Sequence, residues 1–297
     1  MSGRLTPYGR IAARAQFDPC PGWMLGSGQS ATIPARLRKT IWRLLRVPFE
    51  IEWLDGLRLT LYPDNELCRS LFVTGLFEPN EFHWLARFLQ PGMTFIDVGA
   101  NIGLYTLFSA RRVREAGRVL AIEPSAREMD LLRSNVELNS LSNVSLSSLA
   151  LSDHSAEVEL LVAAPRHAGH NTLGAFGYDT PLDHRERVST VCLDHLVESD
   201  RLSRVDVIKM DIEGAELSAL RGAAKTLRQY HPALLLELSD RALQHQSATS
   251  GQVLSFLTEH DYSFFAFDAR SGLPVPLPSR NYFDSENIIA LTGGSLP

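Results

Sequence analysis

Short apolar runs alternate with amphipathic stretches along most of the chain. The apolar runs are rich in aliphatic residues, as strands buried on both faces are, and they occupy residues 94–98, 118–122, 143–149, 205–210 and 233–238. Apolar residues at helical spacing follow in residues 102–114, 125–136 and 215–228. Alternating strands and helices predict an α/β fold built on a doubly wound parallel sheet.

The end of the chain breaks this alternation. A helix is predicted over 252–260, but the strands at 262–268 and 286–291 are separated by a proline-rich loop with no helical pattern. A parallel return needs a crossover of about a dozen residues or more, usually helical. These two strands are therefore predicted to pair antiparallel.

Three parts of the chain differ in pattern. Residues 1–50 are predicted to be an N-terminal extension, irregular at first and then helical. Residues 51–90 hold a strand-like alternation over 51–62 and a helix over 78–89 that leads into the Pro91-Gly92 turn. The main domain is predicted to span 91–297.

An insertion at 155–190 interrupts the main domain. Two strand-like runs, 157–162 and 187–193, flank a polar segment at 163–186 that contains three Gly, three His and one Asn. A polar stretch of this length is expected to be a mobile loop over a site. Ahead of the insertion, Ser125 and Glu128 have the spacing of a capping box at the start of a helix.

Composition narrows the class of protein. The 297 residues are 44% hydrophobic and 21% charged, which is typical of a globular protein. Apolar runs fall far short of the roughly 20 residues that span a bilayer, and no secretory leader is expected. Three widely spaced cysteines favour a reducing cytoplasm over a disulfide framework, and a net charge of -5 argues against a nucleic-acid binder. A homo-oligomer stays possible.

One basic segment stands out against the acidic balance. Residues 36–46 interleave Arg and Lys with Leu, Ile and Trp, which predicts a basic amphipathic helix. We expect it to pack on the main domain with its charges solvated. Contact with a membrane surface or a partner is the alternative.

A candidate cofactor turn follows the first apolar strand of the main domain, at Asp97-Val98-Gly99-Ala100-Asn101-Ile102-Gly103. Gly99 and Gly103 let the backbone bend and approach a ligand, and N–H groups around Ala100 and Asn101 can donate to it. Asp97 could accept from an ammonium group or brace the turn. The dinucleotide pattern needs G-x-G-x-x-G, but Asn101 replaces its second glycine. S-adenosylmethionine has no pyrophosphate and tolerates a nearby carboxylate, so it is the favoured cofactor.

The next two predicted strands end in residues suited to an adenosine. Glu123, followed by Pro124, lies 20 residues beyond Gly103, where an acidic side chain can bind both ribose hydroxyls. Ala150 could contact the adenine ring and Asp153 its exocyclic amine, although Ser152-Asp153 equally fits a turn. The ordered set is a stronger signal than any one member.

Four segments carry a family resemblance: FIDVGANIGLYT at 95–106, AIEPSAREMDLLRSNVELN at 121–139, VDVIKMDIEGAELSALRGA at 205–223 and LLLEL at 234–238. With them the chain resembles the FkbM family of S-adenosylmethionine-dependent methyltransferases, from about Leu71 to the last strand. The resemblance implies a Rossmann-like class I methyltransferase fold with a seven-stranded, mostly parallel sheet and an antiparallel last strand. It also implies methyl transfer, most often to an oxygen of a sugar, polyketide or other small molecule.

Acidic residues near the fourth and fifth strands are the catalytic candidates. Asp211 ends the fourth strand, at the edge of the sheet where ligands bind. It could orient the acceptor, act as general base and contact the cofactor. Glu213 and Glu237 would complete an acidic rim around it. Asp211 and Glu213 could instead cap the next helix. These carboxylates could hold Mg²⁺, but nothing requires it, and no metal is predicted.

Weaker candidates surround this acidic set. His167 and His170, with Asn171 beside them, could contact the substrate or supply a second base. Lys209 is expected to be paired or snorkelling. The acceptor itself leaves no readable motif, and specificity is expected to depend on the N-terminal extension and residues 163–186.

Two other functions compete with methyl transfer to a small-molecule acceptor. A nicotinamide oxidoreductase is disfavoured by the missing glycine and by the antiparallel ending. A non-catalytic or accessory protein could keep the fold, and even the cofactor, without the reaction.

Overall fold

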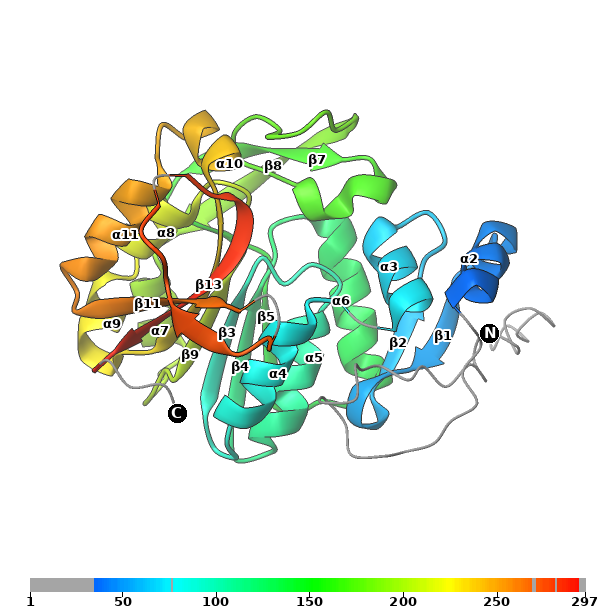
Figure 1. Ribbon diagram of the computed structural model, residues 1–297, viewed down its shortest axis with the longest axis horizontal. Helices are drawn as coiled ribbons and strands as arrows, with labels where there is room; N and C mark the ends of the chain where they lie inside the picture. Colours follow the sequence, from blue (N-terminus) through cyan, green and yellow to red (C-terminus); the bar gives the residue numbers. More distant parts are fainter. Residues whose placement is uncertain (1–34, 76, 269–270, 281, 294–297) are drawn as a thin grey trace.

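The computed structural model describes residues 35–75, 77–268, 271–280 and 282–293, and its centre is an eight-stranded sheet (Figure 1). From one edge to the other the strands are β12 (Pro274–Pro276), β11 (Tyr262–Phe267), β13 (Asp284–Thr292), β10 (Ala233–Ser239), β9 (Val207–Met210), β3 (Thr94–Val98), β4 (Arg118–Ile122) and β5 (Val144–Ser147). The five strands from β10 to β5 are parallel, and β13 is antiparallel to both of its neighbours.

This topology confirms the predicted fold class. Five parallel strands, β11 and an antiparallel β13 give the expected seven, and the short β12 adds an eighth at the edge of the sheet. β12 was not predicted because it begins and ends in proline, which is confined to edge strands. The strands β3 and β4 match their predicted bounds, since strands buried on both faces are mostly apolar.

Helices cover both faces of the sheet (Figure 1). One face packs against α4 (Pro79–Phe88), α5 (Leu104–Val113) and α6 (Ala126–Leu138). The other packs against α7 (Leu193–Ser199), α8 (Glu216–Arg221), α9 (Ala224–Tyr230), α10 (Asp240–His245) and α11 (Ser250–Thr258). Successive strand residues face opposite layers: Phe95 belongs to the first core and Ile96 to the second.

The segment ahead of the sheet differs from its prediction. Residues 51–62 do not form one strand: β1 (Phe49–Glu52) and β2 (Arg58–Leu61) make an antiparallel hairpin around the 3₁₀ turn η1 (Leu54–Gly56). Asp55 and Gly56 both have positive φ there, as tight turns require. The unpredicted helix α3 (Glu66–Thr74) follows, capped by the Asn65 side chain, which accepts from the Cys68 N–H.

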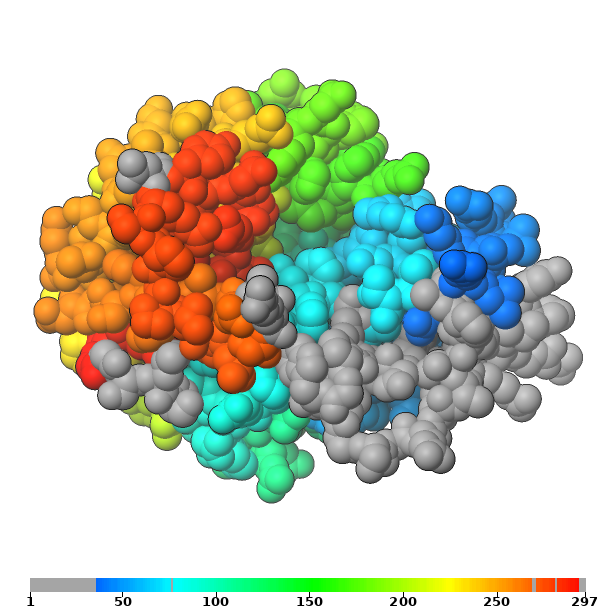
Figure 2. Space-filling view, in the orientation of Figure 1, coloured from blue at the N-terminus to red at the C-terminus, as the bar shows by residue number. Residues whose placement is uncertain are grey.

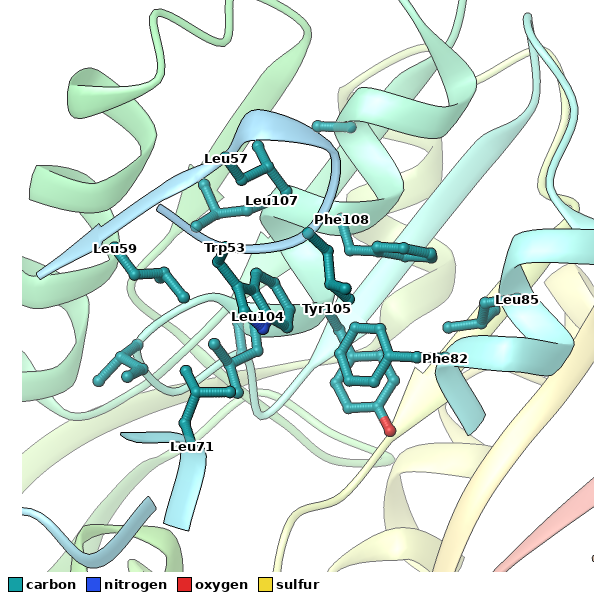
Figure 3. Packing of buried hydrophobic residues seen from close by; sticks show 14 of the residues in the cluster. Trp53, Leu57, Leu59, Leu71, Phe82, Leu85, Leu104, Tyr105, Leu107 and Phe108 are labelled. Atoms are coloured by element: carbon teal, nitrogen blue, oxygen red, sulfur yellow. The ribbon is translucent and has the colours of Figure 1, made fainter. Parts of the chain in front are cut away.

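This early segment shares the core of the main sheet. Figure 3 shows Trp53 and Phe82 against the residues of α5, and the Phe82 ring stacks on Tyr105 with centroids 4.6 Å apart. Phe82 also meets Phe108 edge-on at 5.0 Å. Aromatic pairs of this kind add stability beyond the area they bury, so Trp53 and α4 are held against α5.

Two helical predictions are also corrected. The helix expected over 215–228 is divided into α8 and α9 at Gly222, where a Cβ would lie 2.1 Å from the Ser152 carbonyl oxygen. The Ser125–Glu128 capping box is wrong, because the Ser125 hydroxyl donates to the Glu128 carboxylate and accepts from no helix N–H group. Glu186 accepts from the Ala126 N–H instead, at 2.9 Å.

The insertion forms a small sheet of its own. β7 (Glu157–Ala163) and β8 (Leu182–Val191) pair antiparallel, and β6 (Ala150–Leu151) joins β8 in parallel. β8 begins at Leu182, and the 3₁₀ helix η2 (Pro165–His170) occupies part of the segment between them. The predicted loop at 163–186 is therefore shorter than expected.

The N-terminal predictions are tested only in part. The irregular start of the extension, with Cys20, lies outside the described residues, whereas the basic helix is present as α2 (Ala35–Leu44). Cys68 and Cys192 are free thiols. Among the described residues, no helix combines the length and apolar character needed to cross a bilayer.

Candidate functional site

A cavity of about 490 Å³ opens along the carboxyl ends of β3, β4, β9 and β10. Its volume is in the range of small-molecule sites, and a doubly wound sheet binds ligands at this edge. Figure 2 shows a recess between the green insertion, the cyan α3–α4 segment and the red end of the chain. Most of the predicted site residues line this cavity, namely Gly99, Ala100, Asn101, Glu123, Pro124, Ala150, Asp211, Glu213 and Glu237.

The turn after β3 passes close against the end of β9. Gly99 has φ +74°, and a Cβ on it would lie 1.9 Å from the carbonyl oxygen of Asp211. Only glycine fits there without displacing backbone. Gly103, at φ +96°, does not line the cavity: a Cβ there would meet Leu132 of α6 at 2.5 Å. The first glycine brings the turn to the cavity, and the second packs it on a helix.

Glu123 at the end of β4 is tied to the same turn. One of its carboxylate oxygens accepts from the Asn101 N–H at 2.9 Å and the other from the Ser125 N–H at 3.0 Å. The residue is only 5% exposed, and burial raises the pKa of its carboxyl to about 7. Lone pairs on both oxygens stay available for a diol.

Asp97 does not line the cavity. It is fully buried below the turn, where it accepts from the Thr106 hydroxyl of α5 at 2.6 Å. Of the two roles predicted for it, this contact favours bracing the turn. Burial raises the pKa of the Asp97 carboxyl, although the charge of Lys209 opposes that shift.

Lys209 provides a buried positive charge in the floor of the cavity. Its Nζ lies 3.2 Å from Asp211 Oδ2 and 3.3 Å from the Gly99 carbonyl oxygen, and above the Tyr105 ring. Burial opposes this charge, but Asp211 and Asp97 outweigh burial and raise the pKa of the ammonium. Lys209 is thus paired, as predicted, and links the turn to the end of β9.

Asp211 is the ionised member of the acidic set. Burial alone would raise the pKa of its carboxyl, but the charge of Lys209 and a hydrogen bond with Glu237 lower it. Burial and the charge of Asp211 raise the pKa of Glu213 to about 9 and that of Glu237 well above its usual range. Asp211 can therefore accept a proton near neutral pH, and the other two can donate.

Asp211 and Glu213 do not cap the next helix: the N-cap of α8 is Ala215, and no side chain caps it. The Glu216 carboxylate accepts from the Ile212 and Gly214 N–H groups, both at 3.2 Å. Carboxylate oxygens of Asp211, Glu213 and Glu237 lie within 4.8 Å of one another, a spacing that would also admit a cation.

Glu78 is a cavity residue that sequence reasoning missed. It precedes α4 in a left-handed conformation, φ 46°, and its carboxylate accepts from the Tyr105 hydroxyl and, at 2.8 Å, from Asn287 Nδ2 of β13. Burial and the charge of Asp211 raise the pKa of this carboxyl. The Glu78-Pro79 pair signals a helix start, but nothing local indicates that the side chain reaches the cavity.

The insertion forms the roof of the cavity through η2. His167 and His170 both line it, as does Asn171. His170 Nδ1 lies 2.7 Å from the Thr180 hydroxyl, and burial lowers the pKa of the imidazole, which keeps it neutral. Asn171 donates to Glu128 at 2.9 Å and so fixes the roof to α6.

The end of the cavity near β6 is apolar. Leu149, Ala150 and Leu151 line it beside Pro124. Asp153 lies outside: its carboxylate is 2.6 Å from His154 Nδ1, and its N–H donates to Ser218. The structure therefore does not bring Asp153 to the adenine position.

A sheet with this strand order and antiparallel β13, and a cavity across its carboxyl edge, defines the class I methyltransferase fold. The chain belongs to the FkbM methyltransferase family: the model of the Methyltransferase FkbM domain matches residues 97–264. All the predicted site residues fall inside this match, and Glu78 and Asn287 fall outside it.

Three similar proteins are named as methyltransferases. Methyltransferase sdnD of Sordaria araneosa is 32% identical over 201 residues, covering 58% of this chain and 75% of its own. Methyltransferase 1 of Beauveria bassiana is 30% identical over 143 residues, covering 43% of this chain and only 57% of its own length. Hexuronic acid methyltransferase AglP of Haloferax volcanii is 27% identical over 171 residues, covering 58% and 66%.

The crystal structure of methyltransferase FkbM from Methylobacillus flagellatus KT aligns with a TM-score of 0.41 and 18% identity, covering 78% of this chain and 56% of that one.

Proposed function

We propose that this chain uses S-adenosylmethionine to methylate a hydroxyl oxygen of a small-molecule or glycan acceptor. The observation that carries the proposal is the Gly99 turn held against Glu123, with both facing one cavity. Glu123 would bind the ribose hydroxyls, the apolar end at Ala150 and Pro124 would hold the adenine, and the Gly99 turn would bind the methionine part.

When bound, the cofactor supplies an electrophilic methyl carbon, so the protein must mainly align the acceptor oxygen and remove its proton. Asp211 is our candidate for the general base that accepts this proton, because Lys209 and Glu237 keep its carboxylate ionised. Glu237 and Glu213, protonated near neutral pH, would donate hydrogen bonds to acceptor oxygens. Neutral His170 is a second candidate base.

The acceptor end has a chemical preference of its own. Four carboxyl groups, those of Glu78, Asp211, Glu213 and Glu237, line the cavity around one lysine. A carboxylate placed there would face the ionised Asp211 and lose its hydration, and the one lysine that could offset both costs is already paired with Asp211. We therefore favour a neutral hydroxylated group at this position, even though AglP is named for a hexuronic acid.

Calorimetric titration with S-adenosylhomocysteine tests the cofactor half of the proposal. Hydrogen bonds to a charged group contribute roughly 1.5–3 kcal/mol each, so Glu123→Ala should weaken binding by about ten- to 150-fold. Glu81→Ala is the matched control, since Glu81 is also a buried carboxyl whose pKa is raised to about 7 but does not line the cavity. Absence of binding to the wild-type chain would refute the proposal.

The catalytic half is tested with labelled S-adenosylmethionine and a panel of neutral and acidic glycans and hydroxylated small molecules. Asp211→Asn should abolish transfer while S-adenosylhomocysteine still binds. If the cofactor binds but no panel member is labelled, and Asp211→Asn matches the wild type in every assay, the accessory alternative is favoured.

A further inference from the structure

The basic helix α2 has two apolar faces, and only one of them is covered. Trp42 and Leu45 are buried, and the Trp42 ring lies 5.4 Å from the Phe72 ring of α3. A surface helix normally needs one such stripe. Leu37 and Leu44, two turns apart, lie on a different side of the helix and are 50% and 57% exposed.

Exposed large apolar side chains are concentrated here. In the described part of the chain seven are exposed, and Leu37, Leu44 and Val47 fall within eleven residues. The remaining four lie in β8, in β12 and its flank, and just before β13. An exposed apolar patch on a globular protein indicates an interaction site.

Positive charge flanks this apolar stripe. Arg36, Lys39, Arg43 and Arg46 are all exposed, and residues 35–49 contain no Asp or Glu, although the whole chain carries a net charge of -5. Among the described residues none of these four forms an ion pair; Arg46 donates to the Arg43 and Leu45 carbonyls at the helix end. The charge is therefore available to an anionic partner.

We propose that the outer face of α2 docks the protein on an anionic lipid membrane. Leucines beside a row of Arg and Lys are the pattern of helices that lie in the membrane interface, and anionic headgroups attract each basic residue near the surface. α2 packs on α3, whose residues Glu66, Leu67 and Ser70 line the cavity. Docking brings the side of the cavity lined by α3 within one helix of the headgroups.

The apolar stripe distinguishes a membrane from other anionic partners. A nucleic acid would be bound through its phosphates by the basic residues alone, with no use for Leu37 or Leu44. A second copy of this acidic chain would have to cover the leucines in a defined complex, which would appear as self-association.

Vesicle co-sedimentation with the full chain tests the proposal. We expect binding to phosphatidylcholine vesicles that contain phosphatidylserine, little binding to phosphatidylcholine alone, and release by salt. Each neutralised charge should weaken binding about fivefold, so Arg36→Gln, Lys39→Gln and Arg43→Gln together should weaken it on the order of a hundredfold. Leu37→Gln with Leu44→Gln should weaken it about tenfold or more, while keeping good helix formers on α2.

A matched triple variant controls for net charge. Arg187→Gln, Arg221→Gln and Arg228→Gln remove the same charge from exposed sites on β8, α8 and α9, and the last two helices lie at the opposite end of the molecule from α2 (Figure 1). This variant should bind vesicles nearly as the wild type does, and thermal unfolding verifies that all variants fold.

Several results overturn the proposal: no binding of the wild type to phosphatidylserine vesicles, equal loss in the control triple variant, or no change when the leucines are replaced. Binding of a single-stranded RNA through α2 without vesicle binding would assign the face to nucleic acid. Self-association abolished by the leucine variant, again without vesicle binding, would assign it to a second copy.

Discussion

Replacing Gly99 with alanine probes the closest backbone approach in the cavity. Gly99 has φ +74°, and its added Cβ would lie 1.9 Å from the Asp211 carbonyl oxygen and 3.1 Å from Ile212 Cγ2. The left-handed backbone costs an alanine roughly 1–2 kcal/mol. Relieving a clash with backbone adds about 1–3 kcal/mol. We expect Gly99→Ala to reduce the free energy of unfolding by ~2–5 kcal/mol.

A second glycine separates the two contributions. Gly92 has φ +87°, and a Cβ there would have nothing within 4 Å. Gly92→Ala should therefore cost only the backbone contribution, roughly 1–2 kcal/mol. The difference between the two variants measures the clash at the Asp211 carbonyl.

Urea unfolding of both variants gives the stabilities, and calorimetry with S-adenosylhomocysteine gives the functional effect. Gly99→Ala must displace either the cofactor turn or the end of β9, so its affinity should fall, while Gly92→Ala should bind normally. If Gly99→Ala loses no more stability than Gly92→Ala and binds equally well, the proposed role of this turn is wrong.

Three further outcomes are expected. Burial raises the pKa of Glu123 from 4.5 to about 7, so the folded state holds this proton more tightly than the unfolded state does. The free energy of unfolding should therefore fall as the pH rises from 4.5 to about 7, by up to ~3 kcal/mol from this group. Urea unfolding across that range should show a shallower fall for Glu123→Gln; an unchanged slope contradicts the assignment. Mg²⁺ should leave the melting temperature unchanged, because the Lys209 ammonium already lies 3.2 Å from Asp211 Oδ2 and neutralises it. A melting temperature that rises with Mg²⁺ concentration would instead reveal a cation site. Asp153→Ala should alter S-adenosylhomocysteine affinity by less than about twofold in calorimetry, since Asp153 lies outside the cavity; a larger loss would return it to the adenine site.

The central strands were predictable because strands buried on both faces appear in the sequence as short, mostly apolar runs. β3 and β4 match their predicted bounds, since residues 94–98 and 118–122 are apolar at most positions and are followed by Gly99 and Glu123. The hairpin at Asp55-Gly56 was missed, although such a pair is a known turn signal. The alternation of residues 51–62 continues through the turn and conceals it.

The site was predictable as far as it follows strand ends. Gly99, Glu123 and Asp211 each follow a parallel strand, so topology alone brings them together. Glu78 could not be found this way, because its position depends on a left-handed residue ahead of α4 and on partners in α5 and β13. Asp153 follows β6 but turns to Ser218, a contact that spacing does not encode.

The place of β13 in the sheet has a practical consequence for transplanting this fold into chimeric enzymes. β13 is near the end of the chain, yet it lies between β10 and β11 and pairs with both. A gene fragment cut to the matched residues 97–264 would omit it and leave β10 with a bare hydrophobic edge, a template for aggregation. It would also lose Glu78 and its partner Asn287. A transferable unit must therefore reach from the helix before Glu78 to Thr292.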